Sequence, residues 1–307
     1  ASPGHIEALT LRAAVKLAET NDAHLTVVDV VPPVPRLRKV LEIEGRVIDV
    51  EAALLHDREE RLRRLVENTR AGSTTEVKVI VGEPFIEVIR HVLTHGNDLV
   101  MVGSVPDPES DIMHLLRKCP VPVWVMRPSR SRELRLLALV DPDPDDPVRD
   151  GLNDLVMELA TSLTRRENAA LHIGHAWNLA GESTLRSSPY VALPGGMVDV
   201  MVESIESSLR EELDSLLERH GATDLGATVH MVTGEARVAL PRVADRLDIG
   251  LIVMGTVART GLSGLIMGNT AESILRSVTC SVMAVKPKGF ETPVKPAKGD
   301  RRRTTSE

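Results

Sequence analysis

The stretch LIVMGTVARTGLSGLIMGNTAE, residues 251–272, decides the fold of this chain. It consists of an apolar run typical of a buried strand, a loop with several glycines, and the start of a helix. Glycine allows positive φ and lets backbone N–H groups turn toward an anion. The first turn of a helix adds free N–H groups and the positive end of its dipole. The stretch therefore predicts a phosphate-binding loop between a strand and a helix.

The chain contains a second copy of this pattern. DLVMVGSV at 98–105 aligns with GLIVMGTV at 250–257 without a gap, and GE at 82–83 aligns with GE at 234–235 at the same separation. Such a match indicates a tandem repeat of one domain. The earlier copy lacks the glycine loop, so we expect it to bind no nucleotide.

Length and composition indicate a globular protein of two domains. The 307 residues suffice for two domains of about 150 residues each. We expect them at 1–128 and 133–287, with a disordered tail at 288–307. The formal net charge is −7 and most basic residues are scattered among acids, which argues against nucleic acid as a partner.

No apolar run in the sequence reaches the roughly 18 to 20 residues that a membrane span needs. The two cysteines, Cys119 and Cys280, each precede a short apolar run, which is typical of buried thiols in a reducing compartment. The sequence therefore predicts a cytoplasmic protein without a membrane span.

In both copies, apolar runs of strand length alternate with helical patterns. This alternation predicts an α/β fold in which each domain has an open parallel sheet of Rossmann-like type, covered on both faces by helices. The second copy opens with a strand at 134–140 that leads to Asp141. The first copy opens on a helical pattern at 6–17, so its opening strand is apparently absent. Residues 178–198 form an insertion rich in Gly, Pro and Ser, which we expect to lie over a pocket.

Together these features resemble the universal stress proteins, in the form that carries two such domains in one chain. The resemblance covers nearly the whole sequence. It rests on the order of strands and helices, on Asp141, on GEP at 82–84, on HLLRKCPVPVWV at 114–125 and on the glycine loop. It implies two tandem adenine nucleotide alpha hydrolase-like domains. It also implies association through the last strand of a domain, which a tandem chain can satisfy internally as a pseudo-dimer, or further as a homodimer.

The nucleotide-binding members of that family carry a glycine, two residues, a glycine, nine residues, a glycine and then Ser or Thr. The corresponding residues here are Gly255, Ala258, Gly268 and Asn269, so two of the four positions differ. Asn269 can still donate a hydrogen bond. The resemblance implies that ATP or another adenine nucleotide, with Mg²⁺, is bound by these candidate residues: Asp141, Gly255, Thr256, Arg259, Gly261, Gly264, Gly268, Asn269 and Thr270.

Several of these residues also have simpler interpretations. Asn269 and Glu272 fit a capping box at the start of a helix. Asp141 could cap the helix that follows it, or belong to an acidic loop. Arg259 could be a solvated loop residue. HIGH at 172–175 spells a motif of nucleotidyl transferases, but it lies within a strand, so we interpret its histidines as packed residues.

The sequence supports two functions of different classes. The first is a stress-response binding and signalling protein whose second domain holds an adenine nucleotide. No set of catalytic residues is evident in the sequence, so ATP hydrolysis would be slow at most. The alternative is a nucleotide-independent binding or scaffold protein. In that case the insertion lines a pocket for an apolar or lipid-like ligand through Leu179, Leu185, Val191 and Leu193.

Overall fold

The computed structural model describes residues 3–33, 40–43, 46–69, 75–103, 111–128, 133–143, 145–187, 194, 196–256 and 267–296. These residues form two compact units. Unit 1 comprises the described residues up to 128 together with 292–296, and unit 2 comprises those from 133 to 291. In this part of the chain, none of the helices combines the length and the apolar character that a membrane span requires.

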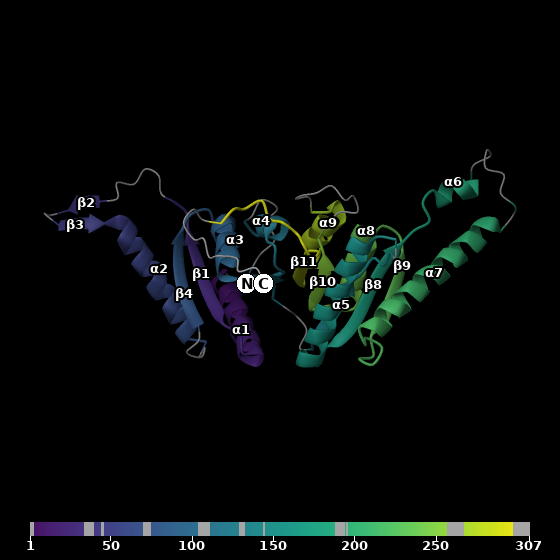
Figure 1. Ribbon diagram of the computed structural model, residues 1–307, viewed down its shortest axis with the longest axis horizontal. Helices are drawn as coiled ribbons and strands as arrows, with labels where there is room; N and C mark the ends of the chain where they lie inside the picture. The colour runs from purple at the N-terminus through teal and green to yellow at the C-terminus, as the bar shows by residue number, and fades with distance from the viewer. Residues whose placement is uncertain are drawn as a thin grey trace, which may run out of the picture. The chain divides into compact units, whose positions relative to one another are not determined.

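Unit 2 is built on five parallel strands in the order β11-β10-β7-β8-β9. Figure 1 labels β11, β10, β8 and β9 of this sheet. The strands are β7 (Arg135–Leu139), β8 (Ala170–Trp177), β9 (Thr228–Thr233), β10 (Leu251–Gly255) and β11 (Ser281–Val285). The central strand is β7, and its Leu136, Leu137 and Ala138 have no exposed surface. The apolar run that opens the second copy therefore forms the middle of the core of this unit.

The helices of unit 2 connect these parallel strands. They are α5 (Pro147–Glu167), α6 (Glu182–Ser187), α7 (Met197–Arg219), α8 (Ala236–Arg246) and α9 (Asn269–Ser277). Helix α5 packs on β7, β8 and β10, while α8 packs on β8, β9 and α9. An ion pair of 3.1 Å between Arg219 and Asp150 joins α7 to α5. Each strand thus passes to the next through a helix, as the alternating pattern predicts.

Unit 1 repeats part of this plan. Its strands form two parallel pairs: β1 (Leu25–Val31) with β4 (Thr75–Val81), and β5 (Val100–Gly103) with β6 (Val123–Met126). The helices are α1 (Pro3–Asn21), α2 (Val50–Glu67), α3 (Pro84–His95) and α4 (Asp111–Lys118). Among the described residues, no strand joins β1 to β5.

Two further elements were not predicted from the sequence. An antiparallel hairpin, β2 (Val40–Ile43) with β3 (Arg46–Asp49), precedes α2. Within the insertion at 178–198, α6 and the first residues of α7 are helical. The runs that form β2, β3 and α6 are each six residues or shorter, and runs of that length give a weak periodic signal.

The described part of the predicted tail has defined contacts. A turn after β11 is closed by a hydrogen bond of 3.2 Å from Phe290 N to Pro287 O. In unit 1, Arg90 Nε donates to Lys295 O at 3.3 Å. The predicted tail beyond residue 296 lies outside the described residues.

Candidate functional site

Four strands of unit 2 end at one edge of the sheet because they run parallel. Asp141 follows β7, His175 lies near the end of β8, Thr256 follows β10 and Lys286 follows β11. In open parallel sheets, ligands bind at this carboxyl edge. The fold therefore brings the predicted Asp141 and the start of the predicted glycine loop to the edge where a ligand is expected.

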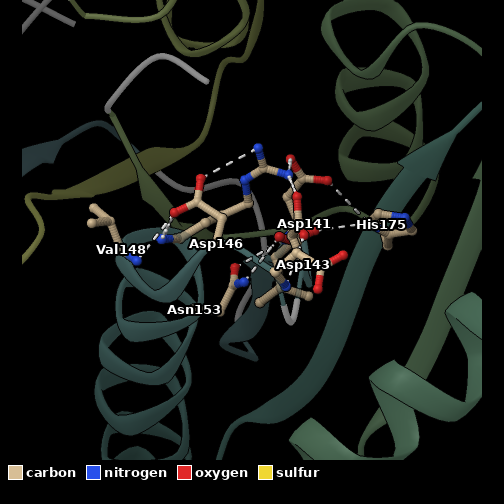
Figure 2. Close-up of polar contacts among 9 residues, drawn as sticks. Asp141, Asp143, Asp146, Val148, Asn153 and His175 are labelled. Atoms are coloured by element: carbon tan, nitrogen blue, oxygen red, sulfur yellow. Dashed lines mark hydrogen bonds and ion pairs between the residues drawn. The ribbon is translucent and has the colours of Figure 1, made fainter. Parts of the chain in front are cut away.

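The segment after β7 is held by α5 (Figure 2). Asp141 N donates to Asn153 Oδ1 at 3.0 Å, and Asn153 Nδ2 donates to Asp141 O at 2.9 Å. Asn153 itself is buried. These two bonds fix the backbone of Asp141, while its carboxylate stays 38% exposed and can be reached by a ligand.

Arg149 connects the acidic residues of this loop. Its guanidinium lies 2.5 Å from Asp143, 3.6 Å from Asp146 and 3.8 Å from Asp141. Asp146 also caps α5 by accepting hydrogen bonds of 3.1 Å from the N–H groups of Val148 and Arg149. The interpretation of Asp141 as the cap is therefore wrong, because Asp146 stands directly before the helix and takes that role.

His175 lies beside Asp141 on β8 and is 2% exposed. Its Nδ1 lies 3.0 Å from Val140 O and 4.0 Å from Asp141 Oδ1. A carbonyl oxygen only accepts, so Nδ1 carries the proton and Nε2 of the neutral ring is an acceptor. Nε2 is buried and has no hydrogen-bond partner among the described residues. An unpaired buried nitrogen is costly, which makes this atom a candidate contact for a donor group of a ligand.

The charge around this edge is predominantly negative. Burial, together with the nearby Asp143 and Asp145, raises the pKa of Glu212. The described residues contain no cluster of three or more His, Cys, Asp or Glu side chains that could hold a metal ion.

Hydrogen bonds fix the residues at the start and the end of the glycine loop. Gly268 N donates to Thr256 O at 3.0 Å, and both N and Oγ1 of Thr256 donate to Val285 O at 3.1 Å. Lys286 Nζ donates to Thr256 Oγ1. Because Thr256 is fully buried and all its polar atoms are engaged, this residue anchors the loop, and a direct contact between Thr256 and a ligand is not supported.

Lys286 places a buried positive charge beside Thr256 at the start of the loop. The residue is 6% exposed, and its Nζ lies 5.4 Å from the centroid of the Phe290 ring, within the range of a cation–π contact. Its position next to the first residue of the loop suits a site for phosphate groups.

Gly255 is required for packing rather than for positive φ, which it does not adopt. A Cβ at Gly255 would lie 2.5 Å from Leu152 Cδ2. At Gly103, the equivalent position of unit 1, a Cβ would lie 2.7 Å from Thr10 Oγ1. In both units this glycine lets a helix approach the end of a strand closely.

Helix α9 presents two predicted residues to solvent. Asn269 and Thr270 form its first positions and are exposed, and Gly268 occupies the N-cap without a side-chain hydrogen bond. Glu272 pairs with Arg276 at 2.5 Å. The predicted capping box is therefore wrong, because Gly268 takes the cap position and Glu272 binds one turn further along the helix. The exposed N–H groups at this helix start can bind an anion.

The other predicted loop residues, Arg259, Gly261 and Gly264, lie outside the described residues.

His172 and His175 lie on opposite faces of β8, because they are three positions apart and side chains alternate between the two faces of a strand. His172 Nδ1 lies 3.0 Å from His230 Nε2, and burial together with Arg135 lowers its pKa. The interpretation of the HIGH sequence as two packed histidines is confirmed.

Sequence reasoning did not include Asn153, Arg149, His175 or Lys286 in the site. The sequence did contain a signal for Lys286, because a lysine directly after a buried strand lies at the carboxyl edge of the sheet. Asn153 gives a weaker signal as a polar residue on the apolar face of a helix.

This fold defines a class of tandem α/β proteins in which polar residues gather at the carboxyl edge of a parallel sheet. The chain belongs to the universal stress protein family, whose model matches residues 7–127 and again 133–286. Universal stress protein E of Escherichia coli (strain K12) is 27% identical over 234 residues, which cover 73% of this chain and 72% of that protein. The similarity thus extends through both units.

Solved structures agree with this assignment. The functionally unknown protein PA1789 from Pseudomonas aeruginosa PAO1 matches with a TM-score of 0.64 and 26% identity, over 90% of this chain and 86% of that one. A universal stress protein from Archaeoglobus fulgidus DSM 4304 shares the fold, with a TM-score of 0.57 and 17% identity, over 90% of this chain and 92% of that one.

Proposed function

We propose that unit 2 binds an adenine nucleotide at the carboxyl edge of its sheet, and that the protein acts through this binding as a stress-response module of the cytoplasm. One observation carries the proposal. This observation is a set of three groups at the carboxyl edge of the sheet: the accessible side chain of Asp141 after β7, a ring nitrogen of His175 on the neighbouring β8 that is buried and has no partner in the described part of the chain, and the buried Lys286 after β11, two strands from β7. A nucleotide offers hydroxyl and amino donors at one end and phosphates at the other, and so matches this set.

Each group has a defined task in this proposal. The Asp141 carboxylate accepts hydrogen bonds from ribose hydroxyls, and Nε2 of His175 accepts from a further donor of the ligand. The charge of Lys286 and the N–H groups at Asn269 and Thr270 attract the phosphates. The predicted loop residues Arg259, Gly261 and Gly264 complete the phosphate site.

The proposed role is binding rather than catalysis. Nε2 of His175 is buried and is occupied by a donor group of the ligand in this proposal, and the guanidinium of Arg149 has no acceptor site for a proton, so neither group is arranged as a general base for an attacking water. The proposed nucleotide is ATP accompanied by Mg²⁺, whose charge offsets that of Asp143 and its acidic neighbours. Hydrolysis, if measured, is expected to be slow relative to dissociation.

A titration tests the proposal. Full-length protein is first denatured, and any released small molecule is identified by mass spectrometry. Protein freed of ligand is then titrated with Mg·ATP, by calorimetry and by thermal unfolding. We expect saturable binding that raises the unfolding temperature, and a loss of affinity of about tenfold or more in Asp141→Ala, since a hydrogen bond to a charged group is removed.

Asp224→Ala is the matched control for this titration. Asp224 is exposed in the turn before β9, at the opposite edge of the sheet, so its removal should leave the affinity unchanged. If millimolar Mg·ATP changes neither the heat signal nor the stability of the wild type, the proposal fails. Equal affinities of Asp141→Ala and wild type would remove Asp141 from the site.

A second candidate function rests on an apolar surface of α7. Met197, Val200 and Met201 are exposed at the helical spacing that forms one face of α7. Of the apolar residues predicted to line a pocket, Leu179 and Leu185 are half-buried, and Val191 and Leu193 lie outside the described residues. Such a face could hold an apolar or lipid-like ligand without any nucleotide. A co-purifying apolar molecule that is lost in Val200→Asp, together with no response to Mg·ATP, would favour this function over the first.

A further inference from the structure

Strands β8 and β9 carry two histidines that face each other, on the side of the sheet opposite to His175. His172 Nδ1 lies 3.0 Å from His230 Nε2, and the planes of the two rings are tilted by 44°. In the parallel register His230 pairs with Gly174, two positions after His172 on β8, so both rings stand on one face. We call these two residues the β8/β9 histidine pair.

The pair lies close to an open edge of the sheet. Strand β9 is the last strand of this sheet among the described residues, and its residues 229–232 are half-buried. Both His172 and His230 are half-buried as well. A small hydrated ion can therefore approach the two rings from solvent.

Both rings are uncharged at pH 7. Burial, together with Arg135, lowers the pKa of His172, and burial, together with His172 and Arg246, lowers the pKa of His230. A neutral imidazole has one protonated and one unprotonated nitrogen, so the contact between the rings uses a single proton. When each ring carries its proton on the outer nitrogen, two lone pairs face the same point. A metal ion can then bind there without displacing a proton.

The spacing of the two nitrogens suits neighbouring ligands of one metal ion. Two metal–nitrogen bonds of about 2.0–2.1 Å place their nitrogens about 2.8–3.0 Å apart at a right angle, and about 3.3–3.4 Å apart at the tetrahedral angle. The distance of 3.0 Å between His172 and His230 matches the right angle, which is typical of Cu²⁺ and Ni²⁺ complexes. No third His, Cys, Asp or Glu of the described residues completes a cluster, so water fills the other positions.

The charges around the pair select against ions that are held by charge alone. Arg135 and Arg246 both act on the two rings. Arg135 also donates to Leu247 O at 3.1 Å and lies 3.5 Å from Asp248, which offsets part of its charge. Ca²⁺ and Mg²⁺ require oxygen ligands, whereas Cu²⁺ and Ni²⁺ form strong bonds to neutral imidazole. The surroundings therefore favour a transition metal over the common hard cations.

We propose that the β8/β9 histidine pair binds one Cu²⁺ or Ni²⁺ ion through His172 Nδ1 and His230 Nε2, with water as the remaining ligands. The ion links two neighbouring strands of unit 2. Because His175 points to the other face of the sheet, this site is independent of nucleotide binding. Cu²⁺ is the better probe, since a given nitrogen site binds it more tightly than Ni²⁺.

A copper titration with matched variants tests the proposal. Full-length protein is freed of metal by a chelator and titrated with Cu²⁺, and electron paramagnetic resonance at one equivalent counts the nitrogens bound to the ion. His172→Gln and His230→Gln each remove one ligand and keep a polar side chain. His24→Gln is the control for adventitious binding, because His24 is an exposed histidine of unit 1 with Glu76 only 3.6 Å from its ring.

We expect wild type and His24→Gln to bind one equivalent of Cu²⁺ with the signal of two nitrogens. His172→Gln and His230→Gln should each weaken this binding by about tenfold or more. The double variant should bind little more weakly than either single variant, because the loss of one ring already breaks the chelate.

Wild type alone provides a second measurement that does not depend on the folding of variants. Bound Cu²⁺ broadens the nuclear magnetic resonance signals of nearby amides, and those of β8 and β9 should broaden first. The proposal is refuted if broadening begins elsewhere, or if the first equivalent of Cu²⁺ shows a single nitrogen. It is equally refuted if His172→Gln and His230→Gln bind Cu²⁺ as tightly as wild type does.

Discussion

Asn153 is the side chain on which the position of Asp141 depends. It is buried, and it bonds both backbone groups of Asp141. We predict that Asn153→Ala lowers the free energy of unfolding of unit 2 by about 1–3 kcal/mol, because it leaves an N–H and a carbonyl unpaired. It should also weaken Mg·ATP binding without touching the ligand. Chemical denaturation and calorimetry measure the two effects.

Asn153→Asp is the informative companion variant. An aspartate can still accept from Asp141 N, but cannot donate to Asp141 O. Asn153→Asp is therefore expected to lower the free energy of unfolding at least as much as Asn153→Ala does, because it also adds a buried charge near Asp141. Wild-type affinity for Mg·ATP in both variants would contradict the positioning role.

His91 gives unit 1 a pH-dependent stability. It is 8% exposed, and burial, with smaller contributions from His95 and Lys78, lowers its pKa to about 4. In the unfolded chain His91 has a pKa near 6.5, so the unfolded state binds the proton more strongly than the folded state does. The free energy of unfolding therefore has its full value above pH 6.5 and declines as the pH falls toward 4.

We predict that the free energy of unfolding of the wild type falls by about 2–3 kcal/mol between pH 6.5 and 4.5, and that this fall is absent in His91→Leu. The free energies of unfolding are compared by urea denaturation at several pH values. His56→Leu is the control, because His56 is exposed on α2 and should retain the wild-type dependence. Parallel pH profiles for His91→Leu and wild type would exclude this origin.

At the scale of single residues, sequence reasoning found the groups that follow an apolar run and missed those fixed by tertiary contacts. Asp141 and Gly268 were placed correctly at strand and loop ends because the pattern of the chain marks such ends. The roles of Asn153 and His175 arise from contacts with residues 12 and 35 positions away, which no local pattern encodes.

At the scale of elements, the end of β10 is shaped by the approach of α5. We predict that Gly255→Ala lowers the stability of unit 2 by about 1–3 kcal/mol, because its Cβ would lie within 3 Å of the Leu152 side chain and force α5 or the side chain to move. Thermal and urea unfolding measure this loss.

The double variant Gly255→Ala with Leu152→Ala separates this clash from a backbone effect. Leu152→Ala alone removes apolar contacts and is destabilising, yet it makes room for the added methyl group. The double variant should therefore be more stable than the sum of the two single losses implies. Additive losses would show that strain in the strand, not contact with Leu152, is responsible.

The sequence predicted element types better than element boundaries. Long runs with clear periodicity, such as those of β8 and α5, were predicted as strand and helix. Helix α7 starts five residues earlier than the predicted 202, and Gly196 at its N-cap adopts a φ of 81°. Helix α9 starts one residue earlier than the predicted 270, and its predicted capping box was wrong, because Gly268 takes the cap position and Glu272 pairs with Arg276.

At the scale of the whole molecule, the two units should differ in stability. In the described part of the chain, unit 2 has five paired strands, and the apolar residues of its central strand are buried, whereas unit 1 has two parallel strand pairs and one antiparallel hairpin, with half-buried apolar residues in β1 and β5. We predict that hydrogen exchange is faster in β1 and β5 than in β8 and β10 by at least about tenfold. Mass spectrometry of the free protein measures this ratio, and similar rates in the two units would contradict the prediction.

The repeat, the α/β class and the family were predictable at this scale, since they depend on the order of apolar and glycine-containing stretches along the chain. The sequence also indicated that the first copy opens on a helix. The separation of the strands of unit 1 into two pairs was not predicted, because pairing depends on which strand lies between two others, and sequence periodicity carries no such information.

The bond from Gly268 N to Thr256 O closes the glycine loop at its base, and Thr256 is in turn anchored to Val285. The two ends of this span are therefore held together by groups at the ends of β10 and β11. If the proposed phosphate site lies in this span, we expect substitutions within 257–266 to change ligand affinity more than the free energy of unfolding. We therefore expect that exchanging residues 257–266 for those of a related chain changes the ligand preference of unit 2 and leaves its fold intact.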